Sequence, residues 1–324
     1  MTDARIVVAG AGSIGCFVGG TLLAAGRSVS FLGRDRIAEE LNGNGLRLTD
    51  YTGMEQSVSA DKIAISTDPT ILQKAEVVFV TVKSGATQEM AELIREHTKT
   101  SATIVSLQNG ISNSETLRDT LKEFDVRAGM VPFNVVQKGN GHFHRATSGD
   151  IKVEQGNPEM AELLDVKHLK TIASKDMNSI LWGKLLINLN NALNALHGGT
   201  LVEQLSDRDQ RRRMADQMKE GLKVIKAEGI SPNPPAPVPA WVIPHILRLP
   251  TPLFRLAAKQ MLTIDPQARS SMSDDIELGR KTEIDELQGA IVMLGKKHEI
   301  PTPMNEQVMA EIKKLEQRNE ERDT

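Results

Sequence analysis

The first half of the chain alternates short apolar runs with segments of helical spacing. Residues 4–9 read ARIVVA, which is typical of a buried strand, and a helical pattern follows to about Ala25. The run SVSFLG then ends at Gly33, and AEVVFVTVKS and ATIVSLQNG occupy residues 75–84 and 102–110. Strands that alternate with helices in this way predict a parallel sheet covered by helices.

The pattern changes along the rest of the chain. Residues 126–153 predict antiparallel strands that complete an α/β domain over residues 1–175. Helical spacing then predicts an all-helical domain over residues 176–324. Within it, residues 231–252 hold eight of the 14 prolines but also several large apolar residues. This composition favours a packed loop or a broken helix over a flexible linker. It leaves open whether the segment is a lid or a pocket wall.

Two charged residues occupy helices that are otherwise apolar. In the predicted helix over residues 181–196, Asn188 and Asn191 lie about 40° and 20° from Lys184, so the three form a polar stripe. In the predicted helix over residues 265–303, Glu283 lies in the middle of an apolar stripe. Because a buried charge without a partner is costly, we expect the ammonium and the carboxylate to face each other. They would form either a structural ion pair or part of a ligand site.

The remaining two asparagines of the first helix, Asn190 and Asn194, lie further round its axis. The pattern gives them no role beyond ordinary contacts or solvation. The C-terminal helix carries Val308, Ile312 and Leu315 on one side. This apolar side either covers the core of its own domain or joins a partner.

A glycine motif follows the first strand directly. Its six residues, which are candidates for cofactor binding, are Gly10, Ala11, Gly12, Ser13, Ile14 and Gly15. In a strand–turn–helix context the three glycines allow a tight turn, close approach of a pyrophosphate, and close packing of helix on strand. The helix N-terminus adds free N–H groups. The motif therefore predicts a dinucleotide site.

The ends of the later strands carry polar residues. Arg34 follows the second strand, where a basic residue accommodates the 2′-phosphate of NADP(H), although the adjacent Asp35 keeps NAD as an alternative. Lys83 and Asn109 follow the next two apolar runs, at the edge where parallel sheets bind ligands. Their alternatives are a surface lysine and an Asn-Gly turn.

Composition narrows the class of protein. The chain has 324 residues, 40% hydrophobic and 25% charged, with a net charge of −3. This charge gives no reason to expect nucleic acid or a membrane surface as a partner, and the basic run at 208–213 is interpreted as a solvated helix face. A single cysteine, Cys16, and the absence of a signal-like N-terminal run favour the cytoplasm. His142 and His144 would share a strand face, but no third ligand suggests a metal.

Taken together, seven motifs resemble those of the ketopantoate reductase (2-dehydropantoate 2-reductase) family, in the family's order. They are GAGSIG at 10–15, GR at 33–34, TVKS at 81–84, LQNG at 107–110, WGKLLINLNN at 182–191, ARSSM at 268–272 and GRKTEID at 279–285. The resemblance implies a Rossmann domain, a helical domain and an active site in the cleft between them. It also implies reduction of 2-dehydropantoate to (R)-pantoate with NADPH, a step toward pantothenate and coenzyme A.

The resemblance also implies roles for individual residues. Lys184 would be the general acid, and Glu283 would bind substrate and orient it. Asn109, Asn188 and Ser271 would hold the substrate, with Lys83 beside substrate and cofactor and Arg34 at the 2′-phosphate. Family members often carry a second asparagine at the position of Ala192, and Asn191 is assigned that role here instead.

Three alternatives stay open at this level. The substrate is either 2-dehydropantoate or another branched 2-keto or 2-hydroxy acid, because pocket walls decide it. A nucleotide-binding sensor without turnover is a third reading, which the presence of both Lys184 and Glu283 disfavours. A monomer and a homodimer are equally compatible with the sequence.

Overall fold

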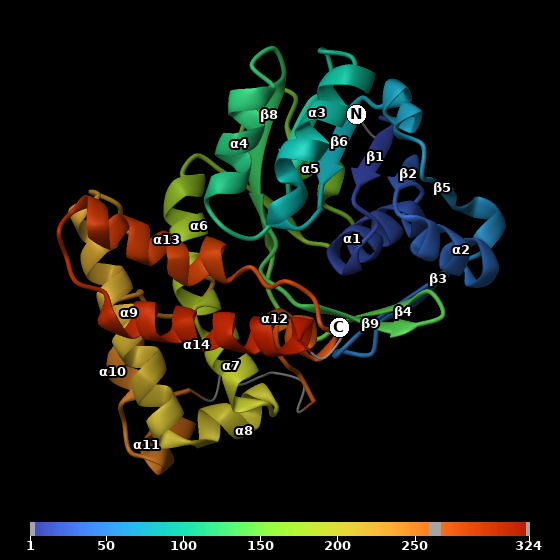
Figure 1. Cartoon of the computed structure of the whole chain (residues 1–324). Coiled ribbons are helices and arrows are strands. Elements are labelled where there is room, and N and C mark those ends of the chain that lie inside the picture. The colour runs from blue at the N-terminus through green and yellow to red at the C-terminus, as the bar shows by residue number, and fades with distance from the viewer. Residues whose placement is uncertain (1–3, 259–266, 322–324) are drawn as a thin grey trace. The chain divides into compact units, whose positions relative to one another are not determined.

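The computed structural model describes residues 4–258 and 267–321. It divides into two compact units, Met1–Met177 and Asn178–Thr324 (Figure 1). Each unit is built around its own buried side chains.

The main sheet of the first unit has eight strands in the order β12-β11-β8-β7-β6-β1-β2-β5. The strands from β5 to β8 are parallel, whereas β11 is antiparallel to β8 and β12 is parallel to β11. Their bounds are β1 Ile6–Ala9, β2 Val29–Leu32, β5 Ala64–Ser66, β6 Val77–Val80, β7 Thr103–Ser106, β8 Asp125–Met130, β11 Ile151–Glu154 and β12 Thr171–Ser174.

A second sheet, in the order β4-β3-β10-β9, lies against α1. It is formed by β3 Leu46–Asp50, β4 Glu55–Val58, β9 Val135–Gly139 and β10 His142–Arg145. The prediction of antiparallel strands over residues 126–153 is therefore right for the pairs β8–β11 and β9–β10 only. It is wrong for β10 with β3 and for β8 with β7, because each of these pairs is parallel and joins segments distant in sequence.

The helices cover both faces of the main sheet, because alternate residues of its strands point to opposite sides. Ile6 and Val8 of β1 pack toward α1, whereas Val7 and Ala9 pack with residues of α3 and α4. In Figure 1, α1 lies between the two sheets. The helices of this unit are α1 Ser13–Ala24, α2 Asp35–Asn44, α3 Thr87–His97, α4 Ser112–Thr120 and α5 Met160–Leu164, with short 3-10 turns η1 Ala60–Lys62, η2 Pro69–Lys74 and η3 Ser84–Ala86.

The described part of the second unit is helical. Its elements are α6 Met177–Asn188, α7 Asn190–His197, α8 Leu201–Ser206, α9 Arg208–Ala227, α10 Ile243–Leu247, α11 Thr251–Ala257, α12 Ser271–Glu277, α13 Ile284–Lys297 and α14 Pro303–Glu320. The C-terminal helix α14 packs on α7, α9 and α13, with Val308 and Ile312 fully buried. Of the two alternatives for its apolar side, the structure therefore shows that it covers the core of its own unit.

The proline-rich segment 231–252 is packed, as its composition predicts. The Asn233 N–H donates to the Ser179 carbonyl of α6 (2.8 Å). A Cβ on Gly183 would lie only 2.2 Å from the Asn233 carbonyl carbon, so this glycine is required for the contact. Trp182 beside it is buried, whereas Trp241 is 65% exposed.

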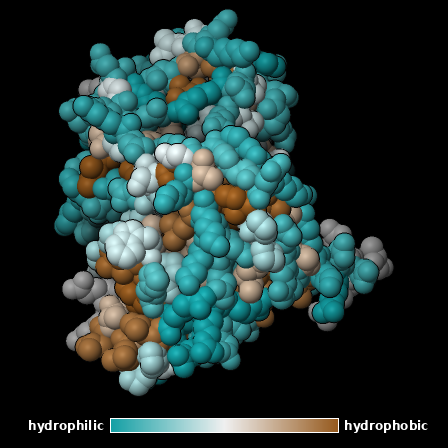
Figure 2. All heavy atoms as spheres, turned by 90° about the vertical axis from the view of Figure 1, so that its left-hand side faces the viewer, coloured by the Kyte–Doolittle hydropathy of each residue, from teal (hydrophilic) through white to brown (hydrophobic). Residues whose placement is uncertain are grey.

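Exposed apolar side chains occur around α10 and α11. Besides Trp241 they include Leu253 and Leu256. Figure 2 shows apolar residues gathered toward the bottom of the face that it presents. None of the helices described in either unit is long and apolar enough to span a bilayer.

Candidate active site

The glycine loop of the first unit has the geometry that its motif predicts. Gly10 has φ +115°, and a Cβ there would lie 2.7 Å from the Val82 nitrogen. A Cβ on Gly15 would lie 2.2 Å from the Gly10 carbonyl oxygen, so α1 can approach β1 only without a side chain at this position. The Thr81 hydroxyl also donates to that oxygen (2.6 Å) and fixes the turn.

Gly12 has a different role in the same loop. It is the N-cap of α1, it is exposed, and a Cβ on it would meet nothing within 4 Å. The first turn of α1, with Ser13 and Ile14 partly buried, therefore presents its N–H groups beside open space. Ala11 is buried and donates its N–H to Leu32. These residues fit a dinucleotide pyrophosphate, which needs backbone donors and the absence of a side chain.

Arg34 lies directly beyond β2, where it is the N-cap of α2 and is exposed. Arg36, two residues on, forms an ion pair with Glu40 (3.2 Å) along α2. The two arginines therefore differ: Arg36 belongs to the helix surface, and Arg34 is at the strand end where a 2′-phosphate would lie.

Lys83 and Asn109 lie at the same edge of the main sheet. Val80 and Ser106 pair in register at the ends of β6 and β7, and each candidate follows three residues later. Lys83 is exposed and Asn109 is partly buried. Gly110 has φ +87°, so the Asn-Gly turn that was the alternative interpretation is present as well.

Lys184 of α6 is partly buried, in a helix whose Trp182, Leu185 and Leu186 are buried. Burial lowers the pKa of Lys184 to about 8, although the negative charge of Glu283 acts in the opposite direction. The two charged residues therefore interact within the second unit, as their burial predicted. A lysine with a pKa near neutrality can donate a proton at physiological pH.

The prediction of one helix over residues 265–303 is wrong; its first two residues lie outside the described part of the chain. Instead α12 ends at Glu277, Gly279 adopts φ +62°, and α13 begins at Ile284. The cause is a linker that α14 holds in place, since Glu316 accepts the Thr282 N–H (2.8 Å). Glu283 is consequently the N-cap of α13 rather than a residue on an apolar helix face.

The helix that carries Lys184 is also interrupted, at Leu189 between α6 and α7. The fully buried Gln288 of α13 donates to the Leu189 carbonyl (2.9 Å) and to Gln217 of α9 (2.9 Å). Leu189 lies five residues after Lys184, and Gln288 lies five residues after Glu283. An electrostatic interaction and a buried amide hydrogen bond therefore connect α13 and its N-cap with Lys184 and with the break after α6.

The four asparagines divide into two pairs. Asn188 and Asn191 are partly buried, as are Lys184 and Glu283. Asn190 is buried and exchanges two hydrogen bonds with Gln204 (2.7 and 3.2 Å). Asn194, which is fully buried, accepts the Ser270 N–H (2.8 Å) and donates to the Gly199 carbonyl (3.0 Å). Of the two expectations for this second pair, ordinary contacts are therefore right and solvation is wrong.

Ser271 is the first residue of α12 and is exposed. The preceding Ser270 caps the helix through Ser273 and donates its hydroxyl to the Asn191 carbonyl (2.9 Å). Together with the Asn194 contact, this bond ties the start of α12 to α7. Because Ser270 is bonded to the Asn191 main chain, the next residue, Ser271, also lies near Asn191.

Arg211 is a buried residue that the sequence interpretation placed in solvent. Its guanidinium donates to the carbonyls of Leu205, Ser206, Leu247 and Leu249 and to Thr251, and it stacks 4.3 Å from the Phe254 ring. Arg211 shares a helical face with the buried Met214 and Met218, and this spacing was the available signal. It therefore joins α9 to the segments around α10 and α11.

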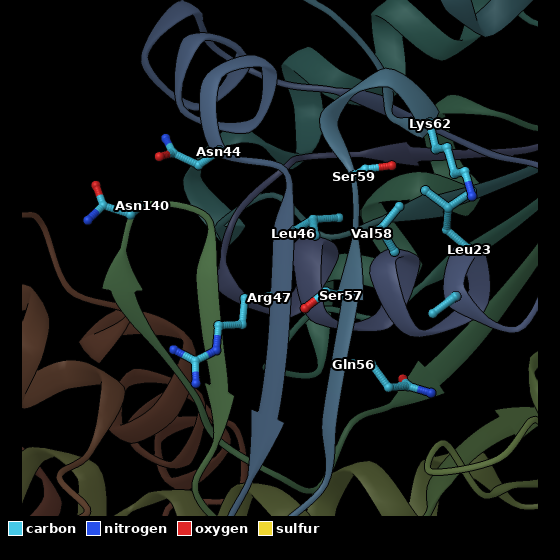
Figure 3. Close-up of a pocket in the computed structure, with 11 residues that line it drawn as sticks. Leu23, Asn44, Leu46, Arg47, Gln56, Ser57, Val58, Ser59, Lys62 and Asn140 are labelled. Atoms are coloured by element: carbon cyan, nitrogen blue, oxygen red, sulfur yellow. The ribbon is translucent and has the colours of Figure 1, made fainter.

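A surface hollow of about 830 Å³ lies elsewhere in the first unit, beside β3 and β4. Figure 3 shows Asn44, Arg47 and Asn140 on one side of the β3–β4 hairpin and Lys62 on the other, without convergence on one point. It reaches Leu23 at the far end of α1, about 16 Å from Gly12 by helical rise. It is therefore separate from the glycine loop.

Metal-binding side chains do not cluster. Across residues 4–258 and 267–321, no group of three His, Cys, Asp or Glu residues could hold a metal ion. His142 and His144 do share a face, and both bond to the Thr49 hydroxyl (2.8 Å each).

The parallel sheet, its glycine loop and the separate helical unit define a Rossmann-type oxidoreductase. Residues 6–158 match the family model described as Ketopantoate reductase PanE/ApbA, and residues 176–316 match that of its C terminal domain. The chain belongs to the ketopantoate reductase PanE/ApbA family.

Individual relatives agree with this assignment. A 2-dehydropantoate 2-reductase of Halobacterium salinarum is 26% identical over 97% of this chain and 99% of its own length. The crystal structure of a PanE/ApbA family ketopantoate reductase from Ralstonia eutropha JMP134 is 29% identical, with a TM-score of 0.82 over 98% of this chain and 99% of its own. D-mandelate dehydrogenase, in a complex with NADH and anilino(oxo)acetate, has the same TM-score and coverage but 20% identity, which shows a common fold only.

Proposed function

We propose that this protein reduces 2-dehydropantoate to (R)-pantoate with NADPH, as a cytoplasmic step toward pantothenate and coenzyme A. The observation that carries the proposal is the interaction of the partly buried Lys184 with Glu283 in a chain of this family. The curated relatives named 2-dehydropantoate 2-reductase support the choice of substrate.

The chemistry of ketone reduction suits these residues. NADPH supplies the hydride when it is bound. As the carbonyl carbon accepts it, negative charge develops on the oxygen, and the Lys184 ammonium stabilises that charge and donates the proton. Glu283 keeps the lysine protonated and accepts a hydrogen bond from substrate. A pKa of about 8 makes Lys184 a stronger acid than an exposed lysine while it remains mostly protonated at pH 7.

The other candidates bind rather than react. In this proposal Asn109, Asn188 and Asn191 donate to oxygens of the keto acid, and Ser271 binds its carboxylate. The loop from Gly10 to Gly15 binds the pyrophosphate, Arg34 the 2′-phosphate, and Lys83, Asn109 and Glu283 also contact the cofactor. Residues 1–175 are accordingly the NADP(H)-binding domain and residues 176–324 the substrate domain.

A related reductase of another branched 2-keto or 2-hydroxy acid is the second candidate. D-mandelate dehydrogenase has the same fold with a different substrate and with NADH. The fold alone therefore leaves both the acid and the cofactor to be tested. The proposal also leaves the oligomeric state to a direct mass measurement; one neighbour of this fold, from Staphylococcus aureus, is described as dimeric.

The test is cofactor oxidation by purified protein with ketopantoate, pyruvate, 2-ketoisovalerate and benzoylformate, each with NADPH and with NADH. We expect rapid turnover with ketopantoate and NADPH, and at least about tenfold lower kcat/KM for every other pair. Preference for another acid would replace the substrate and keep the reaction. NADPH binding without turnover on any acid would favour the sensor.

A further inference from the structure

A buried network of polar side chains joins the loops that carry Lys83 and Asn109. Thr87 of α3, Gln108 after β7 and Asn113 of α4 form it, and they are 2%, 7% and 4% exposed. None of these three residues is among the site residues proposed above, although Gln108 lies in the LQNG motif. Polar groups buried to this degree are costly unless they are fully hydrogen-bonded.

The direction of each hydrogen bond follows from the chemistry of its donor. Gln108 Nε2 donates to the Val82 carbonyl (3.0 Å) and to Thr87 Oγ1 (2.7 Å), which uses both of its hydrogens. The Thr87 hydroxyl therefore directs its own hydrogen to Asn113 Oδ1 (2.6 Å). This bond fixes the orientation of the Asn113 amide.

Asn113 then acts on both loops. With Oδ1 facing Thr87, its Nδ2 donates to Ser84 Oγ (2.9 Å) in the loop after β6 and to the Asn109 carbonyl in the loop after β7. The far end of the network is also satisfied, because the Ser106 hydroxyl donates to Gln108 Oε1 (3.1 Å). The Thr87 hydroxyl therefore connects the amide of Gln108, in the loop after β7, with that of Asn113 in α4, and fixes the orientation of both.

We propose that Thr87 is a positioning residue for the active site. Its hydroxyl holds the Asn109–Gly110 turn and the Lys83–Ser84 segment at a fixed separation, so that the Asn109 amide and the Lys83 ammonium reach keto acid and nicotinamide together. This inference rests on the proposed function for the roles of Lys83 and Asn109. The network itself rests only on contacts within the first unit.

Thr87→Val tests the role, because it keeps the shape of the side chain and removes both hydrogen bonds. Thr87→Ser restores the hydroxyl. The matched control is Thr103→Val at the opposite end of β7, where a buried threonine hydroxyl donates to Asp125 (3.2 Å) away from both loops. Thr103→Val makes the same substitution at a buried threonine of the same unit and removes one hydrogen bond, to the part-exposed Asp125.

We expect Thr87→Val to lower kcat/KM for the keto acid about tenfold through both kcat and KM. Thr87→Ser and Thr103→Val should stay within about threefold of the wild type. In a double-mutant cycle, the losses from Thr87→Val and Asn109→Ala should be less than additive, since part of the effect of Thr87 acts through Asn109. If Thr87→Val and Thr103→Val have the same kinetics and melting temperature shifts, Thr87 is only structural and the inference fails.

Two further measurements keep the outcome decisive. Should Thr87→Val not fold, Ser84→Ala removes one end of the network at a less buried position, and unchanged kcat/KM there would overturn the inference. Should the wild type reduce no keto acid, the proposed function fails, and NADPH affinity still tests the positioning role. Thr87→Val should then weaken NADPH at least about threefold relative to Thr103→Val, and equal affinities would exclude the role.

Discussion

In the proposed function Lys184 is the proton donor, and its pKa of about 8 lies close to the physiological range. A general acid acts only while it is protonated, so its pKa sets the alkaline limit of turnover. With a pKa of about 8, roughly nine in ten lysines are protonated at pH 7 and about one in ten at pH 9. This single residue therefore predicts how the rate depends on pH.

We expect kcat/KM to fall as pH rises through about 8, because kcat/KM reports the pKa of the free enzyme. Glu283→Gln should move this fall to lower pH, because the negative charge of Glu283 raises the pKa of Lys184 and the amide removes it. The measurement is the pH profile of kcat/KM for both enzymes. A profile that is unchanged in Glu283→Gln would show that Glu283 does not act on the general acid.

Arg34 determines cofactor choice in this proposal. Arg34→Ala should weaken NADPH binding by about ten- to a hundredfold and change NADH binding little, since only NADPH carries the 2′-phosphate. Arg36→Ala is the control, because Arg36 already pairs with Glu40. Equal losses for both cofactors in Arg34→Ala, measured by titration, would contradict phosphate recognition at this position.

The sequence predicted single residues better than it predicted their surroundings. Lys184 was singled out because a charge on an apolar helix is costly wherever the helix packs. The same reasoning was applied to Glu283, but the helix predicted around it is interrupted and Glu283 is instead the N-cap of α13. Asn194 and Gln288 were missed, since their partners are main-chain groups of segments distant in sequence. Local periodicity carries no information on such contacts.

At the scale of elements, the sequence predicted the strand–turn–helix of the glycine loop and most helices. It missed the breaks at Leu189 and at residues 278–283. Apolar residues keep a helical spacing through both breaks. Each break is stabilised by a tertiary hydrogen bond: Gln288 donates to the Leu189 carbonyl, and Glu316 accepts the Thr282 N–H. The small sheet was missed because β3 pairs with β10, about ninety residues away.

The packing of α6 against the proline-rich segment leads to a prediction about Gly183. Gly183→Ala should lower the free energy of unfolding by about 1–3 kcal/mol, because its Cβ would overlap the Asn233 main chain, and it should also lower kcat by displacing the adjacent Lys184. Gly289→Ala in α13 is the control. Its Cβ would meet only ordinary contacts at 3.6 Å or more, so it should be neutral or stabilising by up to about 1 kcal/mol.

For both variants, the free energy of unfolding is measured by urea titration followed by circular dichroism, and kcat is measured beside it. A stable and fully active Gly183→Ala protein would show that the segment 231–234 can move away without affecting Lys184.

At the scale of the whole molecule, the chain is two units, each with a separate set of buried residues. The two units are Met1–Met177 and Asn178–Thr324. In the proposed function the first unit binds the dinucleotide and the second unit binds the substrate. A ligand that binds one native unit stabilises that unit by mass action, by about 2.7 kcal/mol at a concentration of 100 Kd.

The chain's two tryptophans, Trp182 and Trp241, both lie in the second unit. Tryptophan emission, excited so that Tyr51 of the first unit is not, is therefore an optical reporter of the second unit alone, without any introduced label. Both units contribute to the circular dichroism signal. We therefore expect NADP+ to raise the melting temperature measured by circular dichroism more than the melting temperature measured by tryptophan emission. Equal shifts in the two signals would show that the units melt as one cooperative body, and the same fluorescence would then report on the entire enzyme.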